Sequence, residues 1–156
     1  MDYQQSRAYI RDAEQYAGGA LDLTNIKEIM KRLGNPQDQL KYVHVAGTNG
    51  KGSVIAYLYT TLTNAGYHVG RYISPSVYSY REKIEVEGTP ISREQFAKHT
   101  TRVAAVIEEM TGEGLAHPTP FEIETAVAFL FFAEEKCDPV ILEVGMGGIT
   151  DATNLI

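Results

Sequence analysis

Apolar residues recur along the chain with two spacings, and these spacings predict helices that alternate with strands. Over residues 4–17, and again from Thr24, apolar side chains fall three or four positions apart, which is typical of a helix with one buried face. Short stretches at 42–46, 68–73 and 140–144 are typical of buried strands instead.

Glycines mark where several of these elements are expected to end. Gly18–Gly19 should end the first helix, and Gly34 should end the second. A further helix is expected to open at the glycine-rich segment 47–53 and to stop at Gly66. The residues expected to face the core from this helix are Val54, Ile55, Leu58 and Leu62.

Capping residues predict two helices in the second half of the chain. Ser92 has a glutamine three residues later, and this capping box indicates a helix that runs to about Met110. The segment Thr119–Glu122 combines Thr, Pro and Glu at the positions that start a helix, which we expect to reach Lys136 and to be buried. Before them, residues 83–86 alternate like a short, half-exposed strand.

This order of elements predicts an α/β fold in which helices cover both faces of a parallel sheet. A helical lead-in at 1–40 would precede an α/β unit at 41–156. A chain of 156 residues is long enough for one domain with its own core.

Composition and charge narrow the class of function. The formal net charge is −6, which argues against sequence-independent binding to nucleic acid. The longest apolar run, 126–133, is far shorter than the roughly 20 residues that cross a bilayer, so no membrane partner is expected. The single cysteine, Cys137, and an N-terminus without signal-peptide character indicate a cytoplasmic protein.

The segment Gly47–Ser53 combines the features of a phosphate-binding loop. It follows a predicted strand and opens a predicted helix, so backbone N–H groups and the helix N-terminus would face an anion, and Lys51 would add a full positive charge. Ser53 or Thr48 would offer a hydroxyl to phosphate or Mg²⁺. The segment departs from the strict phosphate-loop pattern, because Val45 stands where a glycine is usual and Gly52 separates the lysine from the serine. An ordinary glycine-rich turn is the alternative, and nucleotide binding is the favoured interpretation.

Glu143 is the candidate metal ligand. A carboxylate inside an apolar strand is costly unless it is paired or metal-bound, and this one lies where parallel strands would bring it near the phosphate loop. Pairing with a basic residue is the alternative. Ser74 ends the preceding strand at the same predicted edge, and taken alone it is an ordinary strand-end serine.

Several motifs together resemble the folylpolyglutamate synthase/dihydrofolate synthase family, within the Mur-type ATP-dependent amide ligases. The odd phosphate loop is weak as a general motif and is a specific match to this family. The matching segments, in the family's order, are 33–37, 45–53, Ser74–Pro75, 88–92, 119–122, 143–148 and 151–154.

The resemblance implies a role for each matching residue. It implies a phosphate-loop NTPase-like fold of the Mur-ligase central-domain type. Lys51 would act catalytically on the transferred phosphate, and Ser74 and Glu143 would be Mg²⁺ ligands. The residues that would hold ATP are Gly47, Thr48, Asn49, Gly50, Lys51, Gly52 and Ser53. The residues that would line the folate or pterin site are Thr119, Phe121, Glu122, Asp151 and Ala152, with Phe121 as a stacking partner for the flat ring.

The resemblance also implies a reaction. A carboxylate of folate or dihydropteroate would attack the γ-phosphate of ATP to give an acyl phosphate, and the amino group of L-glutamate would then displace phosphate to form an amide. The full-length protein would act as a monomer on these small-molecule substrates. Positioning and charge neutralisation would supply most of the catalysis.

The sequence also departs from the family. Ile149–Thr150 replace an arginine and an apolar residue, Ser76 replaces a histidine, and Lys83 replaces an arginine. In the family the ATPase domain continues past Asn154 and a C-terminal domain helps to bind glutamate. We therefore expect this chain to be an incomplete ATP-binding domain that is inactive alone. The alternatives are a small phosphate-loop kinase or NTPase and a non-catalytic nucleotide-binding fragment.

Overall fold

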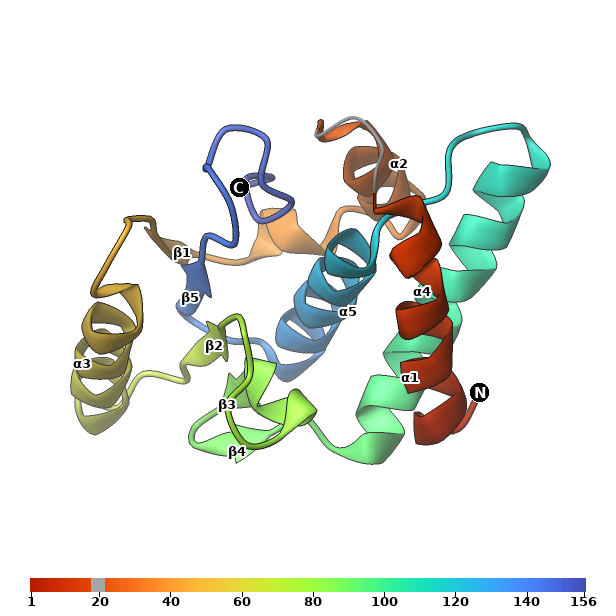
Figure 1. Ribbon diagram of the computed structural model, residues 1–156. Coiled ribbons are helices and arrows are strands. Elements are labelled where there is room, and N and C mark those ends of the chain that lie inside the picture. The colour runs from red at the N-terminus through yellow and green to blue at the C-terminus, as the bar shows by residue number, and fades with distance from the viewer. Residues whose placement is uncertain (18–21) are drawn as a thin grey trace.

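A computed structural model describes residues 1–17 and 22–156, and Figure 1 shows how their helices and strands are arranged. The predicted helix end at Gly18–Gly19 lies outside the described residues. The helices and short 3₁₀ helices are α1 (Tyr3–Asp12), η1 (Ala13–Tyr16), α2 (Thr24–Arg32), η2 (Pro36–Gln39), α3 (Lys51–Asn64), η3 (Tyr80–Lys83), α4 (Arg93–Gly112) and α5 (Pro120–Glu135). The strands are β1 (Tyr42–Val45), β2 (Gly70–Tyr72), β3 (Ile84–Val86), β4 (Thr89–Pro90) and β5 (Val140–Glu143).

The sheet is mixed rather than wholly parallel. Its strand order is β1-β5-β2-β3-β4, and β1, β5 and β2 run parallel as predicted. Strands β3 and β4 are antiparallel to their neighbours. The cause is local, because only Glu87 and Gly88 separate β3 from β4 and both have positive φ angles, of 49° and 77°. A two-residue turn of this kind can join only antiparallel strands.

Strand β3 is buried, so the prediction that it is half-exposed was wrong. Glu85, at its centre, is only 7% exposed. Its carboxylate accepts a hydrogen bond from the guanidinium of Arg71, the residue opposite it on β2. The ion pair satisfies a charge that, by alternation alone, we expected to face solvent.

Helices cover both faces of the sheet, as predicted (Figure 1). Helix α3 lies on one face, where a small core contains Ile55, Tyr59, Val69 and Ile141. Val54, which was expected in this core, is 47% exposed. Tyr59 is buried on this face instead, and its hydroxyl accepts a hydrogen bond from the N–H of Gly88 at 2.6 Å.

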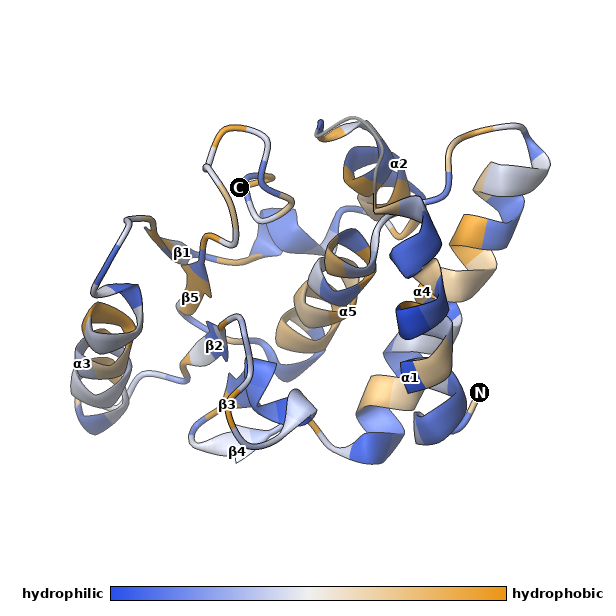
Figure 2. Cartoon of the chain, in the orientation of Figure 1, coloured by the Kyte–Doolittle hydropathy of each residue, from blue (hydrophilic) through white to orange (hydrophobic). Residues whose placement is uncertain are grey.

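The other face carries α5 and, outside it, α1, α2 and α4. Helix α5 is apolar nearly all round and is buried from Glu122 to Phe132, as predicted, and Figure 2 shows its mainly hydrophobic colouring. The largest hydrophobic core includes residues of α1, α2, α4, α5, β2, β3 and β5. The lead-in helices therefore pack as part of the same body as the sheet.

The predicted capping boxes begin α4 and α5. Ser92 Oγ accepts the N–H of Gln95 at 3.0 Å, and Thr119 Oγ1 accepts the N–H of Glu122 at 3.3 Å. The Glu122 carboxylate in turn accepts the N–H of Thr119 at 2.7 Å. These contacts fix the position of the N-terminus of α5, which borders the candidate site.

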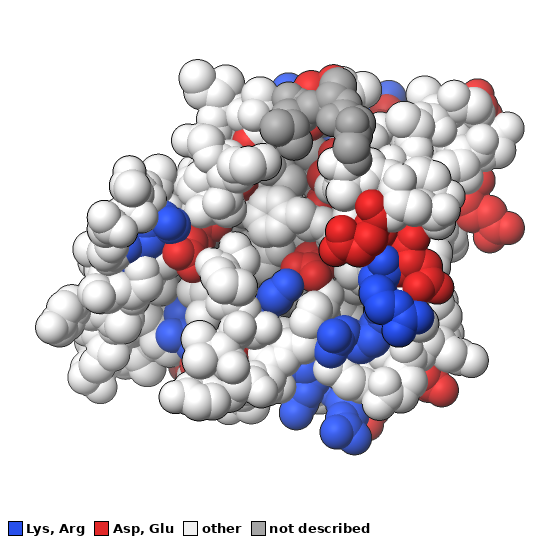
Figure 3. Space-filling view, viewed as in Figure 1, with Lys and Arg blue, Asp and Glu red and all other residues white. Residues whose placement is uncertain are grey.

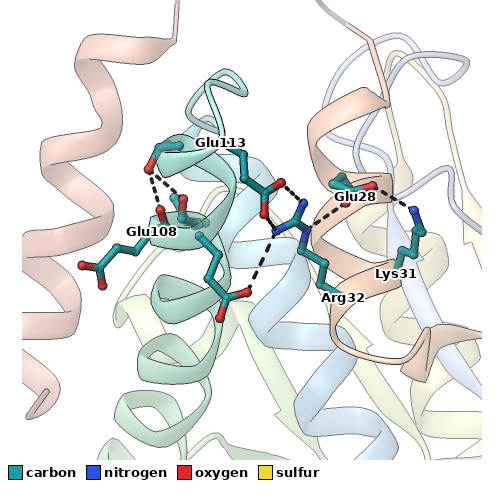
Figure 4. Close-up of polar contacts among 8 residues, drawn as sticks. Glu28, Lys31, Arg32, Glu108 and Glu113 are labelled. Atoms are coloured by element: carbon teal, nitrogen blue, oxygen red, sulfur yellow. Dashed lines mark hydrogen bonds and ion pairs between the residues drawn. The ribbon is translucent and has the colours of Figure 1, made fainter.

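An ion-pair network connects the lead-in to α4 (Figure 4). The guanidinium of Arg32 lies 2.8 Å from a carboxylate oxygen of Glu28 and 2.6 Å from one of Glu113. Lys31 lies 3.5 Å from Glu28 on the same helix. Within the described residues, no helix has both the length and the apolar character needed to cross a membrane.

Candidate functional site

The phosphate loop occupies the connection between β1 and α3. Gly47 and Gly50 have φ angles of 152° and 81°, which place them in the region that glycine adopts most readily. Gly50 is the residue directly before Lys51, the first residue of α3. The backbone thus turns sharply and presents the N-terminus of a 14-residue helix to the loop, as an anion-binding turn requires.

Lys51 lies between the loop and the end of β5. Its Nζ donates to the carbonyl of Gly47 at 3.0 Å and lies 3.8 Å from Oε1 of Glu143. The sequence left Glu143 open between an ion pair and a metal site. The structure places it beside a lysine that itself belongs to the phosphate loop, so both interpretations lead to the same location.

Ser74 lies beside Glu143, as expected for residues at the ends of two parallel neighbours. The N–H of Ser74 donates to Oε2 of Glu143 at 3.1 Å, and Glu143 is 9% exposed. Among the described residues, no three His, Cys, Asp or Glu side chains gather as a metal site. A cation here would have one carboxylate and would need oxygens from hydroxyl, phosphate or water, as Mg²⁺ commonly does in phosphoryl-transfer sites.

A cavity of about 380 Å³ opens next to this point. Its walls come from the N-terminus of α5, the ends of β2 and β5, the loop after β5 and the lead-in. The predicted site residues that line it are Ser74, Thr119, Phe121, Glu122, Asp151 and Ala152. The structure therefore brings all five predicted substrate residues into one cavity, next to the predicted metal ligands.

Close packing fixes the aromatic wall of the cavity. The ring of Phe121 lies 6.1 Å from that of Tyr72, measured between centroids, and the two planes differ by 18°. A Cβ added to Gly145 would lie 2.8 Å from Cζ of Phe121 and 3.2 Å from Oδ2 of Asp151. Only glycine at position 145 allows the loop after β5 to approach the ring this closely.

Asp151 holds the loop after β5 in shape. Its Oδ2 accepts the N–H of Met146 at 2.7 Å, and its Oδ1 accepts both the N–H of Thr153 at 3.0 Å and the Thr153 hydroxyl. Asp151 and Ala152 are each 5% exposed. One buried carboxylate thus connects both ends of the loop.

The charges around the cavity are mainly acidic. Besides Glu122 and Asp151, it is lined by Glu14 and Asp22 of the lead-in, and its described lining includes no Lys or Arg. Asp22 accepts the N–H of Thr24 at 2.8 Å, and this hydrogen bond lowers the pKa of its carboxyl. Figure 3 shows acidic side chains around the hollow in the upper part of this face and a basic patch lower down.

Sequence reasoning missed several residues at this site. Glu14 and Asp22 reach the cavity only because the lead-in packs beside α5, and no local pattern marks that contact. His44 and Thr153 form a hydrogen bond of 2.8 Å behind Asp151. His44 lies three residues before Gly47, and this position beside the predicted phosphate loop was the available signal. Ile149, at a departure from the family pattern, is 86% exposed.

The loop, the lysine and the carboxylate at the carboxyl ends of parallel strands define a phosphate-loop α/β domain. The chain is 41% identical, over 155 residues, to the dihydrofolate synthase/folylpolyglutamate synthase of Bacillus subtilis. That alignment covers 99% of the chain and 36% of the relative.

Solved structures of folylpolyglutamate synthases are also similar to this chain. The folylpolyglutamate synthase of Thermotoga maritima superposes with a TM-score of 0.89 at 38% identity, over 99% of the chain and 35% of that protein. A folylpolyglutamate synthase in complex with AMPPCP and folate superposes with a TM-score of 0.92 at 35% identity, over 100% of the chain and 38% of that protein.

These comparisons confirm the resemblance that the motifs indicated. The chain is homologous to one segment of the proteins of the dihydrofolate synthase/folylpolyglutamate synthase family. It spans about a third of the length of the relatives it matches. No family model matches the chain.

Proposed function

We propose that this chain is the N-terminal part of an ATP- and Mg²⁺-dependent ligase that adds L-glutamate to a folate or dihydropteroate carboxylate. One observation carries the proposal. Lys51 of the phosphate loop lies 3.8 Å from Glu143, and the adjoining cavity gathers Phe121 and Asp151. Nucleotide chemistry and a pocket for a flat ring therefore meet at one edge of the sheet. Monomeric state and cytoplasmic location are part of the same proposal.

The loop fits the phosphates of ATP. Gly47 and Gly50 have the backbone conformations of a turn that can surround an anion, and the first turn of α3 supplies unpaired N–H groups. A β-carbon on Gly50 would meet no atom within 4 Å, so the loop is open on that side. The relative solved with AMPPCP, a nucleotide analogue by name, supports this assignment.

Glu143 and Ser74 fit a magnesium site. The carboxylate of Glu143 is nearly buried, and its counter-charge in the structure is the Lys51 ammonium at 3.8 Å. Mg²⁺ prefers oxygen ligands and often uses one or two carboxylates together with phosphate and water. When bound, the ion would neutralise negative charge on the phosphates.

The cavity fits a heterocycle that carries several N–H groups. Its volume of about 380 Å³ falls in the range of small-molecule sites. Phe121 offers a ring face or edge, and Asp151, Glu122 and Asp22 offer acceptors. A pterin combines a flat ring with amino and ring N–H groups, so the lining suits it. The relative solved with folate supports this choice.

In the proposed reaction, the cavity and Lys51 have different roles. The cavity would hold the ring of the substrate so that its carboxylate points along the sheet edge toward the phosphate loop. Lys51 would stabilise the charge that develops on the transferred phosphate as the carboxylate attacks it. Glutamate would enter at the resulting acyl phosphate, with phosphate as the leaving group.

The test compares alanine substitutions of two lysines, Lys51 and Lys41. Binding is measured with the 156-residue chain, and ligation is measured with the full-length protein. Lys51→Ala should abolish ATP-dependent ligation of glutamate to dihydropteroate or tetrahydrofolate and weaken AMPPCP binding. Lys41→Ala is the matched control, because Lys41 is exposed at the opposite end of β1, 2.9 Å from Asp138. Normal ligation by the Lys51→Ala protein would contradict the assignment. A phosphate-loop kinase or NTPase would instead hydrolyse or transfer phosphate without any need for a pteroate.

A further inference from the structure

A chain of hydrogen bonds crosses from β1 to the loop that forms one wall of the cavity. Nε2 of His44 lies 2.8 Å from Oγ1 of Thr153, which in turn contacts Oδ1 of Asp151. Thr153 is fully buried and His44 is half-buried. His44 lies 109 positions before Thr153, whereas Asp151 and Thr153 are two positions apart. None of the roles assigned above involves His44 or Thr153.

The chemistry of the three groups determines which is the donor and which is the acceptor in each hydrogen bond. An ionised carboxylate has no proton to donate, so the Thr153 hydroxyl must donate to Asp151. The hydroxyl has only one proton, and its contact with His44 must therefore be one in which Nε2–H of His44 donates. This assigns the Nε2–H tautomer to a neutral His44. Burial lowers the pKa of the His44 imidazole, which favours the neutral ring.

These hydrogen bonds leave one oxygen of the Asp151 carboxylate able to accept a further hydrogen bond from a ligand. Oδ1 accepts two hydrogen bonds from Thr153, which satisfies its two lone pairs. Among the residues that the structure describes, the one hydrogen-bond donor to Oδ2 is the N–H of Met146, at 2.7 Å. Since Asp151 lines the cavity, the remaining lone pair of Oδ2 is available to an N–H group of a bound heterocycle.

We propose that His44 and Thr153 are positioning residues that hold Asp151 so that Oδ2 accepts an N–H of the pterin-type ring. The inference rests on the function proposed above. This row of hydrogen bonds begins on β1, three residues before Gly47, and ends at Asp151 in the wall of the cavity. It therefore ties the ring-binding loop to the strand that carries the phosphate loop.

The experiment measures binding of pteroate and of AMPPCP to the 156-residue chain. Thr153→Val keeps the shape of the side chain without the hydroxyl, and His44→Leu removes the donor. Each should weaken pteroate binding about tenfold, the size expected when a buried hydrogen bond is lost. The double variant should lose little more pteroate affinity than either single variant, because both substitutions break the same row of hydrogen bonds. AMPPCP binding should not change.

Two conservative variants separate positioning from general stability. Thr153→Ser keeps the hydroxyl, and His44→Gln keeps an N–H near the place of Nε2, so both should bind pteroate within about twofold of the unchanged chain. A ¹⁵N NMR spectrum of the imidazole should show the Nε2–H tautomer in the unchanged chain. Amide exchange at Met146 should accelerate in Thr153→Val, because Asp151 is then held less firmly.

The outcomes are distinguishable. If the unchanged chain does not bind pteroate, the assignment of the cavity fails, and this inference fails with it. If it binds pteroate and Thr153→Val binds equally well, only the inference is overturned. Parallel loss of pteroate and AMPPCP binding, or an Nδ1–H tautomer of His44, would also overturn it.

Discussion

At the scale of single residues, Gly145 decides how closely the loop after β5 approaches Phe121. Replacement by alanine places a Cβ 2.8 Å from a ring atom and 3.2 Å from Oδ2 of Asp151. The ring is stacked on Tyr72 and cannot simply swing aside. We expect Gly145→Ala to lower the free energy of unfolding by about 1–3 kcal/mol, the usual cost of overpacking, and to weaken pteroate binding.

Gly112 provides the matched control for that substitution. It lies in α4, and a Cβ there would meet nothing within 4 Å. Gly112→Ala should leave pteroate binding unchanged and stabilise the chain by up to about 1 kcal/mol, since alanine favours helix. Urea unfolding and a pteroate titration measure both effects. Equal behaviour of the two variants would contradict the close approach at Gly145.

His99 predicts a pH dependence of stability that is unrelated to the site. The ring is 0% exposed, neither nitrogen has a hydrogen-bond partner among the described residues, and it packs edge-on against Phe131. Burial lowers the pKa of His99 to about 4, although Glu134 at 3.7 Å opposes the shift. Lys98 and Arg102 act with burial to lower it.

The sign of the effect follows from the two pKa values. His99 binds a proton near pH 6.5 in the unfolded chain and only near pH 4 in the folded chain. The stability that depends on a neutral His99 is therefore complete above pH 6.5 and is lost as the pH falls toward 4. The slope due to His99 should approach about 1.4 kcal/mol per pH unit in that window. His99→Leu should flatten the curve measured by urea unfolding at several pH values. An unchanged slope in the variant would assign the effect to other groups.

At the scale of elements, the cap of α5 couples local stability to the cavity. Thr119 caps the helix and also lines the cavity, together with Phe121 and Glu122. Thr119→Ala should cost about 1 kcal/mol of stability and should weaken pteroate binding, because the first turn of α5 would be held less firmly. Thermal unfolding and a binding titration test the two parts separately.

Ser92 is the control for this prediction. It caps α4 with the same capping box and does not line the cavity. Ser92→Ala should therefore cost a similar amount of stability with no change in pteroate affinity. If both variants weaken binding equally, the cap of α5 acts only through overall stability.

The elements also show what a sequence can predict. The starts of α4 and α5 were predictable because Ser92 and Thr119 interact with residues three positions away. The antiparallel β3–β4 pair was not, because Glu87 adopts a positive φ angle without being a glycine. The burial of Glu85 depends on Arg71 across the sheet, and a pattern read along one strand contains no information about such a partner.

At the scale of the whole molecule, the candidate site was predictable to the extent that it is built from strand ends. Lys51, Ser74 and Glu143 meet because β1, β2 and β5 are parallel, so their carboxyl ends share one edge. The acidic wall from Glu14 and Asp22 was not predictable, since it arises from how the lead-in packs against α5. The chemical roles of these residues remain predictions.

The same architecture predicts what the 156-residue chain can do alone. It contains the predicted phosphate loop, the Glu143 carboxylate and a cavity, and we expect these to be enough for binding to AMPPCP and to pteroate. Its matched relatives are about three times as long, since it covers 36% of one and 38% of another. We propose that ligation also needs groups from the part of these relatives that the chain does not span.

We therefore expect the chain to bind both small molecules without joining glutamate to a pteroate. The measurement is ATP-dependent incorporation of labelled glutamate into dihydropteroate or tetrahydrofolate, with the full-length protein as the positive control. Calorimetry with AMPPCP on the same preparation shows that the chain is folded and competent to bind. Robust ligation by the 156 residues alone would mean that glutamate is held at this edge of the sheet, and the division of labour proposed here would be wrong.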